Sequence, residues 1–348
     1  MGNALALGAA RQFRGDHGVA DGLHGSVGQV GPQAVGQALV LAAGLMSTVY
    51  AVKTAFKVGS PLLQCALVFV AGLGLLAAFI RRQSTAQNPM LDLSLTKLPA
   101  IRIGLVIAPV VSGSLAGVEL TIAQELQFVM GNTPLQAGIF MLPIMIAAAV
   151  GGPLAGKLTA AAGLRNVCVL SLLMAAASLA GLGLTNFHEA GLFVAACMAG
   201  LGLSLSIGLT ASSIAIMGSV PPEKGGAAGS IEALGYDLGT GLGITAFGVL
   251  LSALYRSALR LPDSLRADLP RTAVESISDT MVAAELAGGP KGESIAQAAR
   301  LAFSAAHSTV LLTAALLVAL LAAWVFHGLR HQTLKSMTER SNSTASRM

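Results

Sequence analysis

The chain has 348 residues, of which 54% are hydrophobic and 11% are charged, and its mean hydropathy is +0.73. This composition excludes an ordinary soluble domain and indicates an integral membrane protein. The net charge of +5 does not indicate a nucleic-acid partner, because the Lys and Arg residues fall in short loops and tails rather than along one face.

Long apolar stretches recur along the whole chain. A helix needs about 20 mainly apolar residues to cross a bilayer, and only helices satisfy their backbone groups within such a segment. The sequence therefore predicts an all-α integral membrane fold in the lipid bilayer, with eight spans near 38–57, 61–80, 101–127, 135–160, 166–186, 190–217, 227–254 and 306–328.

The polar segments divide the chain into regions. Residues 1–36 are predicted to be a disordered cytoplasmic extension. Residues 255–304 are predicted to be a long outer loop with amphipathic helices at 273–286 and 293–303, joined at Gly288-Gly289-Pro290. The other expected regions are a central helix pair with its cytoplasmic loop (37–98), five further helices (99–254), a last span (305–328) and a cytoplasmic tail (329–348).

Basic residues predict the orientation. They cluster after every second span, at Arg81, Arg82, Lys97, Lys157, Arg165, Lys224, Arg330 and Lys335. The intervening loops 128–134 and 187–189 carry none, and Lys53 and Lys57 are a discordant pair. By the positive-inside rule, both termini are predicted to be cytoplasmic, in a multi-pass protein.

Motifs for enzyme chemistry are absent from the sequence. Gly151 to Lys157 read GGPLAGK, but Leu158 stands where a phosphate-binding loop needs Ser or Thr. The three cysteines and the histidines at 188, 307 and 327 are isolated, so we interpret them as packing or interfacial residues rather than metal ligands. We expect neither an enzyme nor a metal site.

The segment GGPLAGKLTAAAGLRNV at 151–167 instead resembles the helix-turn signature of the major facilitator superfamily. Its matching or supporting residues are Gly152, Gly156, Lys157, Leu158, Gly163 and Arg165, while Ala160 and Ala161 replace the signature's Asp and Arg. The stretches at 88–102, 126–143 and 225–243 are similar to fourteen-helix drug:proton antiporters, such as the methyl viologen and quaternary-ammonium efflux pumps of the bacterial inner membrane.

This resemblance implies that the eight spans correspond to helices 7–14, with the first six-helix bundle missing. It also implies proton-driven antiport of lipophilic cations without a cofactor, in a truncated form that works alone or as a homodimer. The alternative is a non-transporting remnant, or a half-transporter module that needs a separate first-half polypeptide.

Acidic residues inside the spans are the candidate proton- or substrate-binding groups, because such residues usually line a cavity. Glu232 and Asp237 come first, and Glu119 and Glu125 are weaker candidates, with Glu125 expected near the outer surface. The first pair is separated by roughly 140° around a helix. The other interpretation places it near the cytoplasmic end, pairing with Lys224 or meeting water. Gly235, Gly239 and Gly243 predict a helix-packing face in the same span.

Overall fold

The computed structural model describes residues 32–55, 61–85, 95–96, 98–185, 187, 191–262, 265 and 269–345. The predicted extension falls mostly on residues 1–31, which lie outside the described residues, as do Lys57, Lys97 and His188. The remaining residues of that extension, from Pro32 onward, already belong to the first described helix.

The described residues form helices and connecting turns, with no strand among them. Eight helical segments within this part of the chain are long and apolar enough to cross a membrane, which confirms the predicted fold class. These segments are Gly36–Ala55, Leu62–Thr85, Gly104–Val129, Leu142–Ala162, Leu164–Leu184, Gly191–Met217, Pro222–Ala258 and Gly289–His327.

The chain divides into two compact units, one made of residues 1–48 and 67–90 and the other of residues 49–66 and 91–348. The first unit contains most of α2 (Pro32–Ala55) and α3 (Leu62–Thr85), which pack through small residues. A Cβ added at Gly72 would lie 2.6 Å from the Thr48 Oγ1 atom. The Gln83 side chain also donates a hydrogen bond to the Gln37 Oε1 atom at 2.8 Å.

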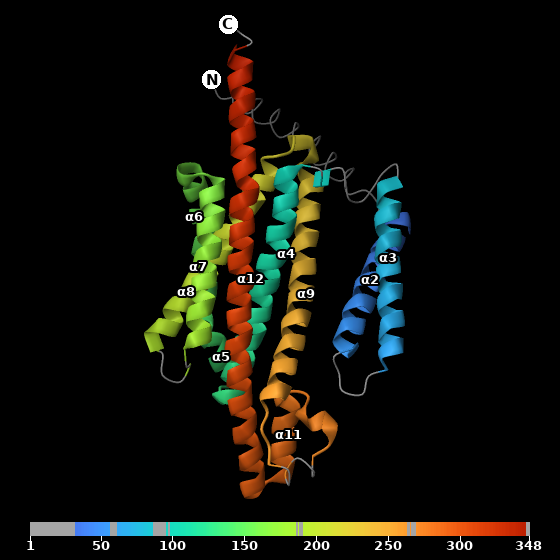
Figure 1. Ribbon diagram of the computed structural model, residues 1–348, viewed down its shortest axis with the longest axis vertical. Helices are drawn as coiled ribbons and strands as arrows, with labels where there is room; N and C mark the ends of the chain where they lie inside the picture. The colour runs from blue at the N-terminus through green and yellow to red at the C-terminus, as the bar shows by residue number, and fades with distance from the viewer. Residues whose placement is uncertain are drawn as a thin grey trace, which may run out of the picture. The chain divides into compact units, whose positions relative to one another are not determined.

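The second unit is a helix bundle (Figure 1). Its helices are α4 (Pro99–Gln124), α5 (Pro134–Phe140), α6 (Leu142–Ala162), α7 (Leu164–Leu184), α8 (Gly191–Met217), α9 (Gly225–Ala258), α11 (Ile277–Ala287) and α12 (Gly289–Ala345). Helix α4 packs mainly on α9, α6 on α8, and α7 on both α8 and α12. The buried core between them contains Ile122, Leu126, Leu172, Leu201 and Phe303.

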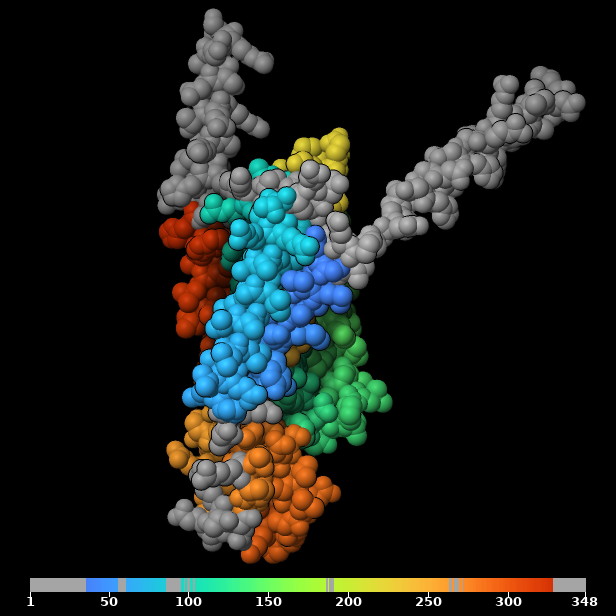
Figure 2. All heavy atoms as spheres, turned by 90° about the vertical axis from the view of Figure 1, so that its right-hand side faces the viewer, coloured from blue at the N-terminus to red at the C-terminus, as the bar shows by residue number. Residues whose placement is uncertain are grey.

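The polar segment after α9 forms a compact end of this unit, coloured orange in Figure 2. The expected amphipathic run at 273–286 contains a short 3₁₀ turn, Arg271–Val274, and then α11. The Ser276 hydroxyl accepts a hydrogen bond from the Asp279 backbone N–H at 3.2 Å and so caps α11. The Tyr255 hydroxyl, at the end of α9, donates to the Thr280 Oγ1 atom at 2.7 Å and fixes α11 against the bundle.

The expectation of a separate surface helix at 293–303 is wrong. These residues belong to α12, a continuous helix of 57 residues that includes the last span and continues to Ala345 in the expected tail. The break between α11 and α12 lies where the join was expected, at Gly288 and Gly289, whose φ angles are +60° and +54°. No Gly or Pro occurs between residues 293 and 327, so nothing in the sequence interrupts the helix there.

Candidate functional site

Glu232 lies in the first half of α9, facing α8. Its side chain is half-buried, and its Oε2 atom accepts a hydrogen bond from the Ser213 hydroxyl of α8 at 3.1 Å. Both residues sit in helices that contain few other charged groups. A single hydroxyl donor solvates a carboxylate only in part, so Glu232 keeps the capacity to bind a further proton or cation.

Glu232 and Asp237 border the same cavity despite their angular separation on α9. This cavity, called here the Glu232 cavity, has a volume of about 320 Å³ and is lined by Leu209, Gly229, Glu232, Ala233, Tyr236 and Asp237. The Asp237 side chain is exposed, whereas that of Glu232 is half-buried. The structure thus brings the two leading candidates to one site, which Tyr236 also lines.

The glycines of α9 pack against α4. A Cβ added at Gly239 would overlap the backbone of Pro109, and one added at Gly243 would overlap the backbone of Gly113. At Gly235 the added atom would make only an ordinary contact, 3.5 Å from Leu105. The Ser112 hydroxyl of α4 donates to the Tyr236 carbonyl of α9 at 2.9 Å. This close packing fixes the wall that carries Glu232 and Asp237.

The two acidic residues of α4 do not join the Glu232 cavity. Glu119 is half-buried in the last third of α4. Glu125 is buried, with 3% of its surface exposed, and it begins a π-helical turn, η2 (Glu125–Val129). Its Oε1 atom accepts a hydrogen bond from the Ser304 hydroxyl of α12 at 2.6 Å. Sequence reasoning missed Ser304 because 179 residues separate it from Glu125.

The helix-turn signature forms the sharp connection between α6 and α7. Gly163 links the two helices with φ +80° and ψ 149°, a conformation nearly restricted to glycine. The Arg165 guanidinium lies over the Phe326 ring of α12, 4.1 Å from its centroid. Gly156 and Lys157 are exposed, and a Cβ added at Gly152 would come no closer than 3.8 Å to Thr210.

The tight α6–α8 contact is made by Gly151, the neighbour of the predicted Gly152. A Cβ added at Gly151 would lie 2.9 Å from the Leu203 carbonyl oxygen. Alongside it, the Ser206 hydroxyl of α8 donates to the Ala148 carbonyl of α6 at 2.8 Å.

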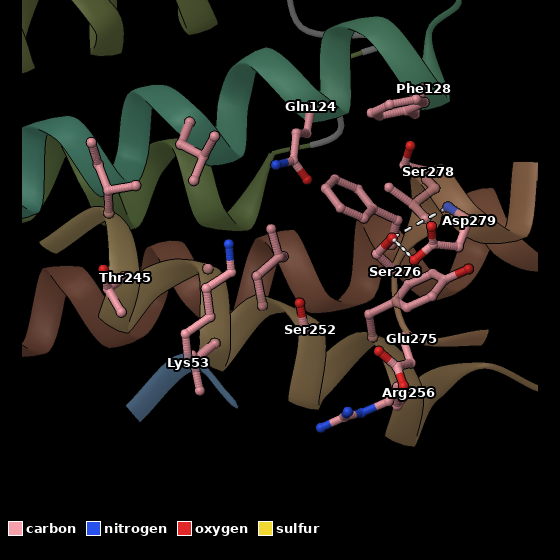
Figure 3. A pocket seen from close by; sticks show the side chains of 18 residues that line it. Lys53, Gln124, Phe128, Thr245, Ser252, Arg256, Glu275, Ser276, Ser278 and Asp279 are labelled. Atoms are coloured by element: carbon pink, nitrogen blue, oxygen red, sulfur yellow. Dashed lines mark hydrogen bonds between the residues drawn. The ribbon is translucent and has the colours of Figure 1, made fainter. Parts of the chain in front are cut away.

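A larger cavity, of about 630 Å³, lies at the α11 end of the bundle (Figure 3). Gln124 and Phe128 face it from the end of α4, opposite Ser276 and Asp279. The Ser276 hydroxyl donates to the Asp279 carboxylate at 2.6 Å, so that carboxylate is already engaged in the helix cap. Because Arg256 also lines this cavity, the wall presents charges of both signs. No three His, Cys, Asp or Glu side chains of the described residues gather as a metal site.

Known drug efflux proteins align with most of this chain, although no family model matches it. The chain is 39% identical over 298 residues to the methyl viologen resistance protein SmvA of Salmonella typhimurium, covering 86% of this chain and 60% of the relative. It is 30% identical over 284 residues to the multidrug efflux pump LfrA of Mycolicibacterium smegmatis, covering 81% of this chain and 56% of the relative.

A third relative is the tetracenomycin C resistance and export protein of Streptomyces glaucescens. It is 27% identical over 215 residues, and the alignment covers 62% of this chain and 40% of that protein. The chain thus spans about 60% of the length of the first of these relatives. These alignments, together with the all-helical fold and its eight apolar helices, bear out the resemblance predicted from the motifs. The chain is therefore similar, over most of its own length, to drug efflux proteins of the major facilitator superfamily.

Proposed function

We propose that this chain supplies the cation- and proton-binding half of a proton-coupled efflux transporter for lipophilic cations. The observation that supports this most directly is the Glu232 cavity, where a half-buried carboxylate inside a long apolar helix faces open space. The relatives are described as a methyl viologen resistance protein and a multidrug efflux pump, and methyl viologen is a dication. A carboxylate is the natural partner of such a substrate.

The energetic cost of a negative charge inside the membrane explains how the Glu232 carboxyl group can bind either a proton or a lipophilic cation. An acidic side chain at the centre of a membrane helix costs about 2.5–3.5 kcal/mol on insertion scales. A low-dielectric surrounding favours the neutral acid, whereas a bound cation favours the carboxylate. A proton and a lipophilic cation therefore compete for Glu232, and binding of one promotes release of the other.

The neighbouring residues have separate roles in this proposal. Ser213 orients the Glu232 carboxylate through its hydrogen bond. Tyr236 offers an aromatic face to the cation, and the exposed Asp237 provides a second negative charge at the cavity. Glu119 and Glu125 stay outside this cavity in the described structure, so we assign neither of them to cation binding.

We place the protein in the bacterial inner membrane with both termini in the cytoplasm. The distribution of Lys and Arg in the short loops supports this orientation. It puts the α6–α7 turn on the cytoplasmic side and α11 on the outer side. Transport would then follow alternating access between two bundles around the Glu232 cavity.

Ethidium efflux from cells that lack their own pumps tests the proposal. The 348-residue chain is expressed alone, or together with the part of the Salmonella relative that it does not match, and membrane insertion is checked by blot. We expect ethidium efflux that a proton uncoupler abolishes. Glu232→Gln should also abolish this efflux, and Asp237→Asn should weaken it. Glu285→Gln, an exposed position on α11, is the matched control and should leave efflux unchanged.

The outcomes separate the two interpretations. Efflux only in the presence of the added polypeptide, with stable co-purification of the two, supports a half-transporter module. Efflux by the chain alone supports an assembly from copies of this chain. Unaltered efflux and proton coupling in both Glu232→Gln and Asp237→Asn would refute the assignment of the cavity. Absence of efflux from well-inserted protein, expressed alone or with the added polypeptide, would favour a non-transporting remnant.

A further inference from the structure

A second polar cluster lies where the end of α4 meets α12, away from the Glu232 cavity. Glu125 accepts a hydrogen bond from Ser304, and His307 follows one turn later on the same side of α12. The His307 imidazole is 3% exposed and lies edge-on to the Phe187 ring, with 5.0 Å between the ring centroids. Glu125 and His307, which no motif connects, are thus both buried and line the same cavity with Ser304.

The hydrogen-bonding capacity of this cluster is only partly used. The Glu125 Oε2 atom and both ring nitrogens of His307 are buried without a hydrogen-bond partner in the structure. One imidazole nitrogen faces the backbone of Thr121, but without the geometry of a hydrogen bond. A buried polar atom left without a partner destabilises the fold, because it has lost its hydrogen bonds to water. Such a set is stable only if something else occupies the space between the atoms.

The structure has an open space beside these unpartnered atoms. A cavity of about 540 Å³, called here the His307 cavity, has Glu125, Ser304 and His307 in its wall together with Gly183, Phe187 and Arg300. A polar cavity of this size has ample room for water molecules that bond to several protein groups. Among the lining residues, the charged and titratable side chains are Glu125 from η2 and His307 and Arg300 from α12. Arg300 is exposed, whereas Glu125 and His307 are buried.

The backbone at Glu125 is also unusual. Residues Glu125–Val129 form a π-helical turn, in which the wider hydrogen-bond spacing interrupts the regular helix. Such turns are rare and occur frequently at functional sites. Here the turn coincides with the position at which the buried carboxylate meets α12.

We propose that Glu125 and His307 form a second proton-binding site, in which the carboxylate and the imidazole share one proton through a bridging water molecule in the His307 cavity. With one proton between them the pair is neutral overall, whether the proton resides on the carboxyl oxygen or on the ring nitrogen. A neutral pair avoids the cost of an isolated buried charge. Loss or gain of that proton charges the contact between α4 and α12, so the site links protonation to the packing of these helices.

This proposal does not depend on the Glu232 cavity, and its test needs no transport. Purified full-length protein is reconstituted into lipid nanodiscs, and infrared difference spectra are recorded across a pH titration. A protonated carboxyl in an apolar site gives a C=O stretch above the amide I band. We expect Glu125→Gln to remove one such band, and Glu232→Gln and the exposed Glu293→Gln to leave it in place.

The partner of Glu125 is identified by the titration midpoint of that band. His307→Gln should move the midpoint upward by about one pH unit or more, because the remaining carboxyl loses the group that accepts its proton. Arg300→Gln should move it much less, since Arg300 is exposed. Ser304→Ala should shift the frequency of the band without removing it, because the hydroxyl bonds directly to the carboxyl.

Two results would overturn the proposal. The first is a spectrum of Glu125→Gln that matches the unmodified protein, which would mean that Glu125 binds no proton in this range. The second is a midpoint that stays fixed in His307→Gln, or that moves as far in Arg300→Gln, which would remove His307 from the site. Circular dichroism and a single peak on size exclusion establish that each variant remains folded, and Ser304→Ala tests the site where a larger change unfolds the protein.

Discussion

The contact between α4 and α9 should depend on the absence of a side chain at Gly239. In Gly239→Ala, the new methyl group would overlap the Pro109 backbone and crowd the Ser112 hydroxyl. Backbone cannot rotate away as a flexible side chain can, so α9 must shift from α4. Overpacking of this kind costs about 1–3 kcal/mol.

A matched control lies two residues away on the same helix. A Cβ added at Gly241 would meet no atom within 4 Å, and Ala in place of Gly favours a helix by roughly 0.5–1 kcal/mol. The propensity gain is common to both alanine variants, which should therefore differ in free energy of unfolding by the overpacking cost alone, about 1–3 kcal/mol. Both add one methyl group to α9, so helix propensity and hydrophobicity change equally.

Thermal unfolding in detergent micelles, followed by circular dichroism, measures this difference. We expect the melting temperature of Gly239→Ala to fall by several degrees, since 1 kcal/mol corresponds to about 2–4 °C in a domain of 150–250 residues. Gly241→Ala should melt at or slightly above the unmodified protein. Equal melting temperatures for the two variants would show that α4 and α9 do not pack through Gly239, and would refute the geometry on which the Glu232 cavity is built.

Two further predictions concern the ends of the bundle. Gly163→Ala should destabilise the protein by about 1–3 kcal/mol in the same assay, because its φ of +80° is strained for any other residue. Gly156→Ala, inside α6 with no atom within 4 Å of the new methyl, should melt at or slightly above the unmodified protein, as Gly241→Ala should. Tyr255→Phe should remove the hydrogen bond to Thr280 and speed amide exchange in α11 about fivefold, the effect of losing about 1 kcal/mol; unchanged exchange in α11 would contradict the role of this bond.

The helical class and the eight membrane segments could be predicted because both follow from local composition. A run of about 20 apolar residues has one stable solution in a bilayer, whatever its neighbours are. The same reasoning fails at residues 293–303, where the polar side chains predict a separate surface helix and the structure has part of α12. Helices end at breakers and caps, and this segment contains neither, so α12 continues through it.

The candidate site was predictable in part for the same reason. Glu232 stood out because a charge within an apolar helix is unusual, and that signal is local. Its partner Ser213 and the pair of Ser304 and His307 depend on which helices meet, and residue spacing carries no such information. His307 was interpreted as an ordinary packing residue, and its ring is indeed packed against Phe187, but its neighbours also include a buried carboxylate.

The surroundings of the two carboxylates fit different ligands. Glu232 is half-buried beside an open cavity with Tyr236 and Asp237, which suits an organic cation that needs both room and negative charge. Glu125 is 3% exposed, and its Oε2 atom is buried beside the His307 cavity, whose described lining residues include no second carboxylate, which suits a proton or a bridging water molecule. Helix α4 contacts α9 with one part of its surface and α12 with another. A proton bound at Glu125 therefore acts on the helix that supports the wall of the Glu232 cavity. Protonation of Glu125 can in this way change the Glu232 cavity, although the proton and the substrate bind at different sites.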